Sequence, residues 1–365
     1  MHRRQLLKQT ALAVAAFTVS RDLFSREADR TIKIRGWANF IKLSANENPY
    51  GPSPMARKAM TEAVNGSNRY PWETTTQLRK KIGAMYNLSM DNITMGAGSS
   101  ELLGVVSLMA ALKNGNGVAP DPTFRLWMPA AKKTGLPVKL VPLTSARTTD
   151  LQRIKDSMDG NTKMVYLCNP ANPTSNVIPG GDLATFIKEI APKCIILLDE
   201  AYTEFSEEPS MAKWVNDYPN LIVAKTFSKI YGMAGARVGF ALAHPQTIVQ
   251  LNELQPWANA GASAVSLAGA LASLQDQEFV SYCKKENQKC RSIFYAALDK
   301  VGMPYLKSST NFVYFDSAPY PKDVRHLLES QQIVGARTFE EGSKWLRLSI
   351  GTAAEMEKVA EVLKG

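Results

Sequence analysis

The sequence predicts an α/β protein with a large, mainly parallel sheet and a second, smaller α+β unit. Short apolar and β-branched runs recur after residue 90, and helical patterns lie between several of them. Residues 303–365 instead combine shorter strands with two helical patterns. The chain has 365 residues, which is enough for one large domain with a smaller companion.

The expected strands of the large sheet follow in order along the chain. They are "NITMGAG", "GNGVAPD", "KMVYLCNP", "CIILLDEAY", "LIVAKTF" and "ARVGFALA", with helical patterns such as Ser100–Leu112 and Gly181–Ile190 between them. Strands that alternate with helices indicate a parallel sheet with helices on both faces.

The rest of the chain predicts a smaller unit. Ala264–Val301 is long, apolar-periodic and rich in helix formers, and we expect one helix there that leaves the large domain. The segments "NFVYFD" and "KWLRLSI" predict strands beyond it. We expect four parts: a tail at residues 1–30, an arm at 31–58 that joins the small domain, a large domain at 59–270, and a small C-terminal domain at 271–365.

Charge and cysteine content limit the possible functions. The net charge of +10 is spread along the chain, so nucleic-acid binding is disfavoured and anionic ligands are favoured. Four cysteines form no CxxC pair and only three histidines are present, which disfavours a metal site. Cys168 lies in an apolar run, and we expect it, like Cys283 and Cys290, to be a buried, reduced thiol.

The N-terminus has the pattern of an export signal. Arg3 and Arg4 precede Lys8 and an apolar stretch from Ala11 to Val19, the order found in twin-arginine signals. This pattern predicts a periplasmic protein; the alternative is a basic tail on a cytoplasmic protein. The apolar stretch is too short to span a bilayer, so we expect no stable membrane anchor.

Unusual polar residues follow several expected strands, where ligands of parallel sheets gather. "GAGSSELL" opens a helix with Gly98, Ser99 and Ser100, which can present N–H groups and hydroxyls to an anion. The alternative is that Ser99 is only a helix cap. The third glycine of a dinucleotide fingerprint is missing, because Glu101 stands in its place.

Two further strand ends carry an amide and a carboxylate. Asn172 lies in the rigid turn "CNPANPT", and Asp199 directly follows the apolar run Ile195–Leu198. A carboxylate at the buried end of a strand needs a cationic or hydrogen-bonding partner. That partner is either a structural cation or a protonated pyridine nitrogen, and the turn at Asn172 is also explained by its prolines alone.

The segment "KTFSKIYGMAGARVGF" combines a hydroxyl pair with a lysine and an arginine. Thr226 and Ser228 can donate to a phosphate, and Arg237 can bind it with a charged fork. Lys229 would then lie beside the anchored cofactor and could form an imine with its aldehyde, while an aspartate keeps the ring nitrogen protonated. A solvated surface loop is the alternative.

Taken together, the motifs from Leu43 to Val362 resemble the fold-type-I pyridoxal 5′-phosphate (PLP) aminotransferases, and most closely their histidinol-phosphate aminotransferase branch. The segments that carry this resemblance occur in the family's order: "LSANENPYGPSP", "NRYPWETTTQLRKKI", "GAGSSELL", "PDPTFRLW", "CNPANPT", "LDEAYTEF", "TFSKIYGMAGARVGF" and "WLRLSIGTAAEM". The resemblance implies a large domain with a seven-stranded type of sheet and a homodimer with shared active sites.

The resemblance also implies roles for individual residues. The catalytic residues would be Lys229, Asp199 and Tyr202. The cofactor would be held by Gly98, Ser99, Ser100, Phe124, Asn172, Asp199, Tyr202, Thr226, Ser228, Lys229 and Arg237, with Tyr70 reaching the phosphate in the partner subunit. The substrate would be bound by Asn48, Arg337 and Arg347, of which Arg347 would clamp a carboxylate.

The expected reaction moves an amino group between an amino acid, or histidinol phosphate, and a 2-oxo acid. We expect a carboxylate-bearing amino acid to be preferred. Two alternatives stay open. One is a PLP-dependent decarboxylase of a phosphorylated amino acid, which would share the fold and most of the motifs. The other is an exported binding protein without catalysis.

Overall fold

The computed structural model describes residues 40–124 and 126–365. The chain divides into two units, 1–42 and 43–365. Of the first unit, the strand β1 (Ile41–Lys42) is described. The export signal predicted in residues 1–30 lies outside the described residues. All that follows concerns residues 43–365.

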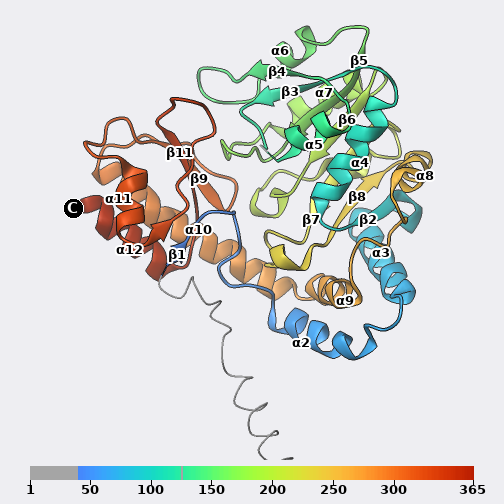
Figure 1. Ribbon diagram of the computed structural model, residues 1–365, viewed down its shortest axis with the longest axis horizontal. Helices are drawn as coiled ribbons and strands as arrows, with labels where there is room; N and C mark the ends of the chain where they lie inside the picture. Colours follow the sequence, from blue (N-terminus) through green and yellow to red (C-terminus); the bar gives the residue numbers. More distant parts are fainter. Residues whose placement is uncertain (1–39, 125) are drawn as a thin grey trace, which may run out of the picture. The chain divides into compact units, whose positions relative to one another are not determined.

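A seven-stranded sheet forms the centre of this body, as Figure 1 shows. Its strand order is β2-β8-β7-β6-β5-β3-β4, and only β8 runs against its neighbours. The strands are β2 (Ile93–Gly96), β3 (Asn116–Asp121), β4 (Val138–Pro142), β5 (Thr162–Cys168), β6 (Ile195–Asp199), β7 (Leu221–Thr226) and β8 (Gly239–Ala243). The expectation of a mainly parallel sheet is therefore confirmed.

Helices cover both faces of this sheet, because its central strands are apolar on both sides. In β5, Val165 and Leu167 belong to one core, whereas Met164 and Tyr166 belong to the other. The first core is completed by α3 (Trp72–Tyr86), α6 (Leu151–Asp156), α7 (Gly180–Ile190) and α9 (Ala264–Ser273). The second core is completed by α4 (Ser99–Ala111), α5 (Trp127–Lys133) and α8 (Pro245–Leu254).

Two elements differ from the sequence-based expectation. The edge strand β4 was not anticipated, because only Val141 of its five residues is buried and the run lacks a clear apolar pattern. The single helix expected over Ala264–Val301 is wrong: α9 ends at Ser273 and α10 (Gln277–Lys300) starts anew. The side chain of Asp276 accepts the backbone N–H of Phe279, and this N-cap begins the second helix.

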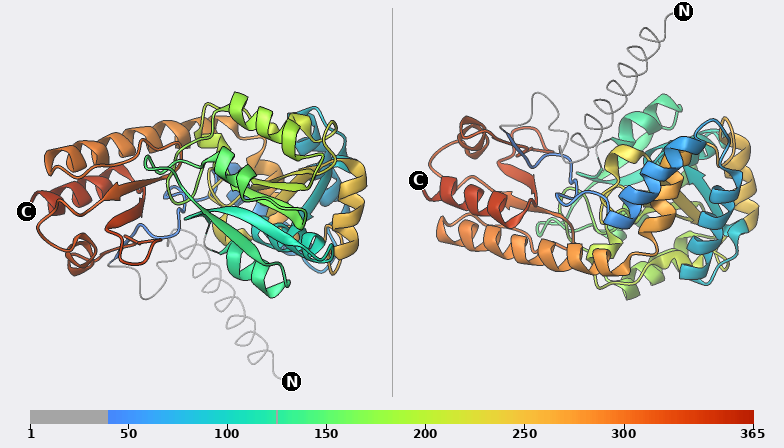
Figure 2. Two further views of the ribbon diagram at one scale, coloured as in Figure 1. Left: turned by 90° about the horizontal axis from the view of Figure 1, so that it is seen from above. Right: turned by 90° about the horizontal axis from the view of Figure 1, so that it is seen from below.

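A two-stranded antiparallel sheet, β9 (Phe312–Asp316) with β11 (Trp345–Ser349), is the centre of the C-terminal part. It is accompanied by α10, α11 (Val324–Ser330) and α12 (Ala353–Lys364), and α10 packs along α12 (Figure 2). The remaining elements are α2 (Pro54–Ala63), which packs on α9, the short strand β10 (Ile333–Val334), and the 3-10 turns η1 (Val64–Gly66), η2 (Met90–Asn92), η3 (Thr203–Phe205), η4 (Met211–Trp214) and η5 (Ala234–Ala236).

The parallel register brings three strand ends to one edge of the sheet. Cys168 of β5 lies opposite Asp199 of β6, and Asp199 lies opposite Ala224 of β7. The residues after these strands therefore meet at the carboxyl edge, where open α/β sheets bind ligands. The division into domains at 59–270 and 271–365 stays a prediction. None of the described helices is long and apolar enough to cross a membrane.

Candidate active site

A cavity of about 380 Å³ lies at this carboxyl edge. Most of the residues predicted from the motifs line it, namely Ser99, Ser100, Phe124, Asn172, Asp199, Tyr202, Thr226, Ser228, Lys229, Arg237, Arg337 and Arg347. They come from the ends of β3, β5, β6 and β7, the start of α4, the loop before β8, and β11 with the loop before it. The fold thus brings together residues that are up to about 250 positions apart in the sequence.

One end of the cavity is suited to an anion. Arg237 Nη1 lies 3.4 Å from Ser228 Oγ, to which it donates, and Nη2 donates to the carbonyl of Ala97, 3.2 Å away. Gly98 precedes α4 with a φ of 79°, and a Cβ there would overlap the Arg237 guanidinium. A helix N-terminus, hydroxyls and an arginine fork together match the needs of a phosphate group.

The buried carboxylate of Asp199 lies deeper in the cavity. Its Oδ2 accepts a hydrogen bond of 3.0 Å from Tyr166 Oη, and its Oδ1 accepts one of 3.2 Å from the Ala201 N–H. Burial raises the pKa of Asp199 to about 6, although both hydrogen bonds and the charge of Lys229 favour the ionised form. Such a carboxylate fits a protonated ring nitrogen.

Lys229 supplies a primary amine between these groups. Its Nζ donates to the carbonyl oxygens of Ala45 and Asn46, at 3.1 and 3.3 Å. Burial lowers the pKa of Lys229 to about 8, and the positive charge of Arg347 acts in the same direction. An appreciable share of the amine is therefore neutral near neutral pH and can attack an aldehyde.

Two amides orient the phenol of Tyr202. Asn46 Nδ2 donates to Tyr202 Oη at 3.0 Å, and Asn172 Nδ2 donates to it at 3.4 Å. A phenol has one proton to donate. With both amides donating to its oxygen, that proton is available to an acceptor in the cavity, such as a ring oxygen.

Arg337 and Arg347, which we expected to bind the substrate, also line the cavity. Arg347 Nη1 donates to Asn172 Oδ1 at 2.6 Å, and Nη2 donates to the Ser44 carbonyl at 3.2 Å. Phe339 covers the guanidinium, with its ring centre 4.6 Å from Arg347 Cζ. Arg337 forms an antiparallel bridge with Arg347, and both side chains line the cavity.

Three of the predicted site residues do not line this cavity. Gly98 lies directly behind it, as described above. Asn48 instead donates to the Ile230 carbonyl and to Cys283 Sγ, at 2.8 and 3.3 Å. Tyr70 is 66% exposed on the surface, where it packs against Trp72 and Trp257.

Several lining residues were not anticipated from the sequence, namely Ser44, Ala45, Asn46, Leu126, Cys168, Ala201, Ala234, Thr338 and Phe339. Of these residues, Asn46 was the easiest to predict from the sequence, because it lies inside the quoted motif "LSANENPYGPSP". In the structure it has a left-handed φ of 53°. Cys168 was expected in the core; it is buried, as are the other three cysteines, and all four are free thiols.

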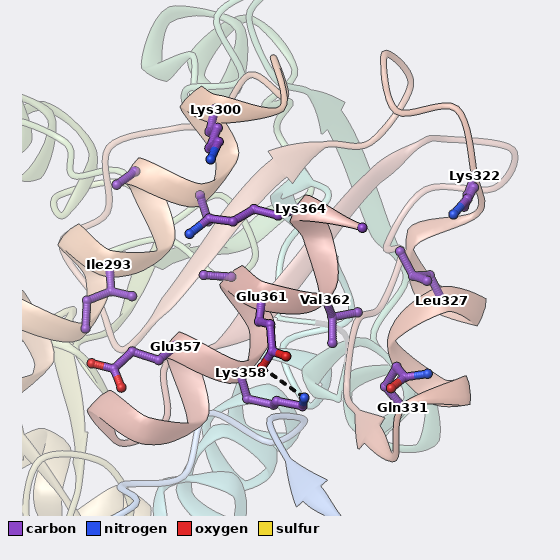
Figure 3. A pocket seen from close by; sticks show the side chains of 14 residues that line it. Ile293, Lys300, Lys322, Leu327, Gln331, Glu357, Lys358, Glu361, Val362 and Lys364 are labelled. Atoms are coloured by element: carbon purple, nitrogen blue, oxygen red, sulfur yellow. Dashed lines mark hydrogen bonds and ion pairs between the residues drawn. The ribbon is translucent and has the colours of Figure 1, made fainter.

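A larger hollow of about 960 Å³ lies between α10, α11 and α12 (Figure 3). Lysine and glutamate side chains of α12 line it together with Lys300 of α10, and α11 contributes Leu327. Lys358 there pairs with Glu361 at 2.9 Å. None of the predicted site residues lines this hollow. Among the described residues, no three His, Cys, Asp or Glu side chains gather as they would around a metal ion.

The cavity at the carboxyl edge fits PLP group by group. The Arg237 end suits its phosphate, Asp199 its ring nitrogen, Tyr202 and Asn172 its ring oxygen, and Lys229 its aldehyde. Gly98 leaves the space that the Arg237 guanidinium takes at the phosphate end.

The chain is similar to known proteins over most of its length. The family model "Aminotransferase class I and II" matches residues 38–363. Histidinol-phosphate aminotransferase of Symbiobacterium thermophilum is 33% identical over 332 residues, which are 90% of this chain and 91% of that protein. Histidinol-phosphate aminotransferase 2 of Ralstonia nicotianae is 34% identical, over 87% of this chain and 86% of that protein.

A solved structure agrees with this similarity. Histidinol-phosphate aminotransferase from Sinorhizobium meliloti, in complex with pyridoxal-5′-phosphate, superposes with a TM-score of 0.81 at 26% identity. The match covers 89% of this chain and 90% of that one. Neither the decarboxylase nor the non-catalytic alternative is favoured by these similarities.

Proposed function

The chain belongs to the class I and II aminotransferases and is a PLP-dependent transaminase, and we propose that its amino donor is an α-amino acid whose carboxylate binds Arg347. In this proposal Lys229 binds the cofactor and carries the proton that moves at the donor's Cα. Bound PLP supplies an aldehyde that captures the amino group and a ring that accepts the electron pair of the Cα–H bond.

Each of the other residues has a separate task. Asp199 holds a proton on the ring nitrogen, and Tyr202 with Asn172 orients the ring by its oxygen. Phe124 covers one face of the ring. Ser99, Ser100, Thr226, Ser228 and Arg237 hold the phosphate, which fixes the position of the ring relative to Lys229.

The position of Arg347 carries the substrate proposal. Its guanidinium lines the same cavity as Lys229, and its plane is fixed by Asn172 on one terminal nitrogen and by the Ser44 carbonyl on the other. A planar guanidinium held in this way can bind a carboxylate through two parallel hydrogen bonds. The donor's Cα, next to that carboxylate, would then lie within reach of the lysine.

Histidinol phosphate is the second candidate donor, because the relatives described above are histidinol-phosphate aminotransferases. It has no α-carboxylate, so its phosphate would use Arg347, Arg337 or both. The antiparallel bridge places these two arginines directly opposite each other, and side chains of such a pair share one face. Two like charges at this spacing repel each other, and a divalent anion between them would remove the repulsion.

A half-reaction screen separates the two donors. The PLP-loaded enzyme is mixed in stoichiometric amounts with individual amino acids or with histidinol phosphate, and the loss of the aldehyde form of the cofactor is followed by its absorbance. We expect an amino acid to react fastest. Faster conversion by histidinol phosphate than by every amino acid would reverse the substrate assignment but leave transamination intact. Release of carbon dioxide would favour the decarboxylase instead.

A homodimer with shared active sites completes the proposal. Tyr70, Trp72 and Trp257 pack against one another with ring centres 5.0–5.6 Å apart, yet their side chains are 66%, 44% and 52% exposed. An exposed aromatic cluster of this kind is typical of a protein interface. In the dimer this cluster is covered by a second copy, and Tyr70 reaches the phosphate in the partner subunit.

The cellular location is proposed from the sequence alone. Arg3, Arg4 and the following apolar stretch favour export to the periplasm by the twin-arginine route, which carries folded, cofactor-loaded proteins. The alternative is a cytoplasmic enzyme with a basic tail.

A further inference from the structure

The hydroxyl of Tyr166 is the only side-chain donor among the hydrogen bonds found for Asp199 in the described part of the chain. Tyr166 and Asp199 lie on the neighbouring strands β5 and β6, where Tyr166 is paired with Leu197. Asp199 is therefore its diagonal neighbour on the same face of the sheet, a separation that an aromatic side chain can span. The bond measures 3.0 Å, and Tyr166 is fully buried.

The ring of Tyr166 is held in position by a stack. Trp127 of α5 lies against it with ring centres 4.1 Å apart and planes inclined by 8°. Trp127 Nε1 in turn donates to Ser107 Oγ at 2.9 Å, and Ser107 donates to the Leu103 carbonyl within α4. All residues in this series of contacts are buried. The phenol therefore cannot rotate away from the carboxylate without disturbing the core between the sheet and the helices.

We infer that Tyr166 is a positioning residue that decides how the proton is shared between Asp199 and the ring nitrogen of the bound cofactor. A hydrogen bond donated to a carboxylate favours its ionised form and lowers its attraction for a further proton. With Tyr166 in place, the shared proton stays on the ring nitrogen, and the ring accepts electrons well. This inference rests on the proposed pairing of Asp199 with that nitrogen.

Other groups also act on Asp199 and must be kept constant in a test. Cys168 lies opposite it on β5, Glu200 follows it in the chain, and Lys229 faces it across the cavity. Burial and the Glu200 charge raise the pKa of Asp199, whereas the hydrogen bonds from Tyr166 and the Ala201 N–H and the charge of Lys229 lower it. The substitution Tyr166→Phe changes none of these residues and keeps the ring that stacks on Trp127.

The direct measurement is the ¹⁵N NMR signal of the intact enzyme loaded with PLP that is labelled at the ring nitrogen. The signal position reports whether this nitrogen carries the proton. Asp199→Asn gives the limit in which the carboxylate is absent. We expect the Tyr166→Phe signal to lie between those of the wild type and Asp199→Asn, because the carboxylate without its hydrogen bond draws the proton toward itself.

Tyr295→Phe is the matched control. Its ring also stacks on a neighbour, Tyr305 at 4.4 Å, and its hydroxyl also takes part in a hydrogen bond, from the Ser308 N–H at 2.7 Å, but it lies on α10 away from the cavity. This variant should give the wild-type signal. Thermal unfolding of each variant checks that the fold is kept.

The outcomes are distinguishable. If Asp199→Asn moves the signal but Tyr166→Phe leaves it at the wild-type position, the inference about Tyr166 is overturned and the role of Asp199 stands. If Asp199→Asn itself does not move the signal, the proposed pairing with the ring nitrogen is wrong, and the inference is lost with it. An equal shift of the ¹⁵N signal in Tyr295→Phe would mean that the loss of any tyrosine hydroxyl moves the signal. This result would also overturn the inference about Tyr166.

Discussion

Arg347 Nη1 and Asn172 Oδ1 are joined by a hydrogen bond of 2.6 Å, although the two residues are 175 positions apart in the sequence. The bond connects β11 of the C-terminal sheet with the turn after β5 of the large sheet. Asn172 also donates to Tyr202 Oη, so one amide links Arg347, the proposed substrate arginine, to the phenol that we propose orients the cofactor ring. Arg347, Asn172 and Tyr202 therefore form a single hydrogen-bond network.

The first prediction concerns Lys229. Lys229→Ala should abolish transamination but keep most of the affinity for the cofactor, because the residues proposed to hold the phosphate remain in place. Borohydride treatment followed by peptide mass analysis should place the cofactor on Lys229 in the wild type and nowhere in the variant. A variant that still transaminates near the wild-type rate would refute the assignment.

The second prediction concerns the substrate arginine. Loss of one partner of a buried, charge-assisted pair costs about 2–5 kcal/mol. Arg347→Ala should therefore lower kcat/KM for the best amino acid by roughly thirtyfold to several thousandfold, at about 1.4 kcal/mol per decade. Arg347→Lys keeps the charge but lacks the planar guanidinium, so its kcat/KM should lie between those of the wild type and Arg347→Ala.

Arg153→Ala serves as the control for this series, because the Arg153 side chain is exposed on α6 and pairs only with Asp150 among the described residues. It should leave kcat/KM unchanged. If Arg347→Ala behaves in the same way, Arg347 does not bind the donor.

The third prediction concerns the pH dependence of stability. Burial raises the pKa of Asp199 to about 6, above its usual value of about 3.9. Between these values the folded chain keeps a proton that the unfolded chain has lost, so the stability contributed by this group falls as the pH rises from 4 to 6. Above pH 6 the cost of the buried charge is about 3 kcal/mol, at about 1.4 kcal/mol per pKa unit.

Asp199→Asn removes this titrating group. Any difference in stability between the variant and the wild type at pH 4 sets the baseline of the comparison. From that baseline, the free energy of unfolding of the cofactor-free variant should rise relative to that of the wild type by pH 7. Thermal unfolding of both cofactor-free proteins from pH 4 to 8 measures the difference. Parallel pH profiles would show that Asp199 does not titrate in this range.

The fourth prediction concerns the dimer. A charge placed in the aromatic cluster, as in Trp72→Asp with Trp257→Asp, should convert the dimer to monomers and weaken cofactor binding, because a buried unpaired charge is costly at an interface. Sedimentation velocity measures the change in mass. Leu112→Asp, at an exposed apolar residue beyond the end of α4, is the control and should stay dimeric. A wild-type protein that sediments as a monomer would contradict the shared-site proposal.

The fifth prediction concerns export. Residues 1–35 fused to a folded reporter should deliver it to the periplasm in a host with a twin-arginine system, and Arg3→Lys with Arg4→Lys should stop delivery. Cell fractionation measures the reporter on each side of the inner membrane. Retention of the unaltered fusion in the cytoplasm would favour the basic-tail alternative.

The sequence by itself determined the large sheet and many of the residues that meet at its carboxyl edge. The apolar runs that end at Asp199 and Thr226 are strands in the structure. Asn172 and Lys229 follow strands as expected, whereas Arg237 lies in the loop just before β8. This succeeds because a parallel strand is a short local pattern, and because the carboxyl ends of parallel strands must meet at one edge. No tertiary information was needed to bring these residues together.

Only the tertiary structure decided how the remaining residues lie around that edge. Asn48 and Asn46 are two positions apart in one motif, yet Asn46 contacts Tyr202 in the cavity and Asn48 turns toward Cys283 of α10. Tyr166 has the pattern of a core residue, and its contact with Asp199 depends on the register of two strands. Such contacts join side chains far apart in sequence, and they are set by packing between elements, for which a local apolar pattern contains no signal.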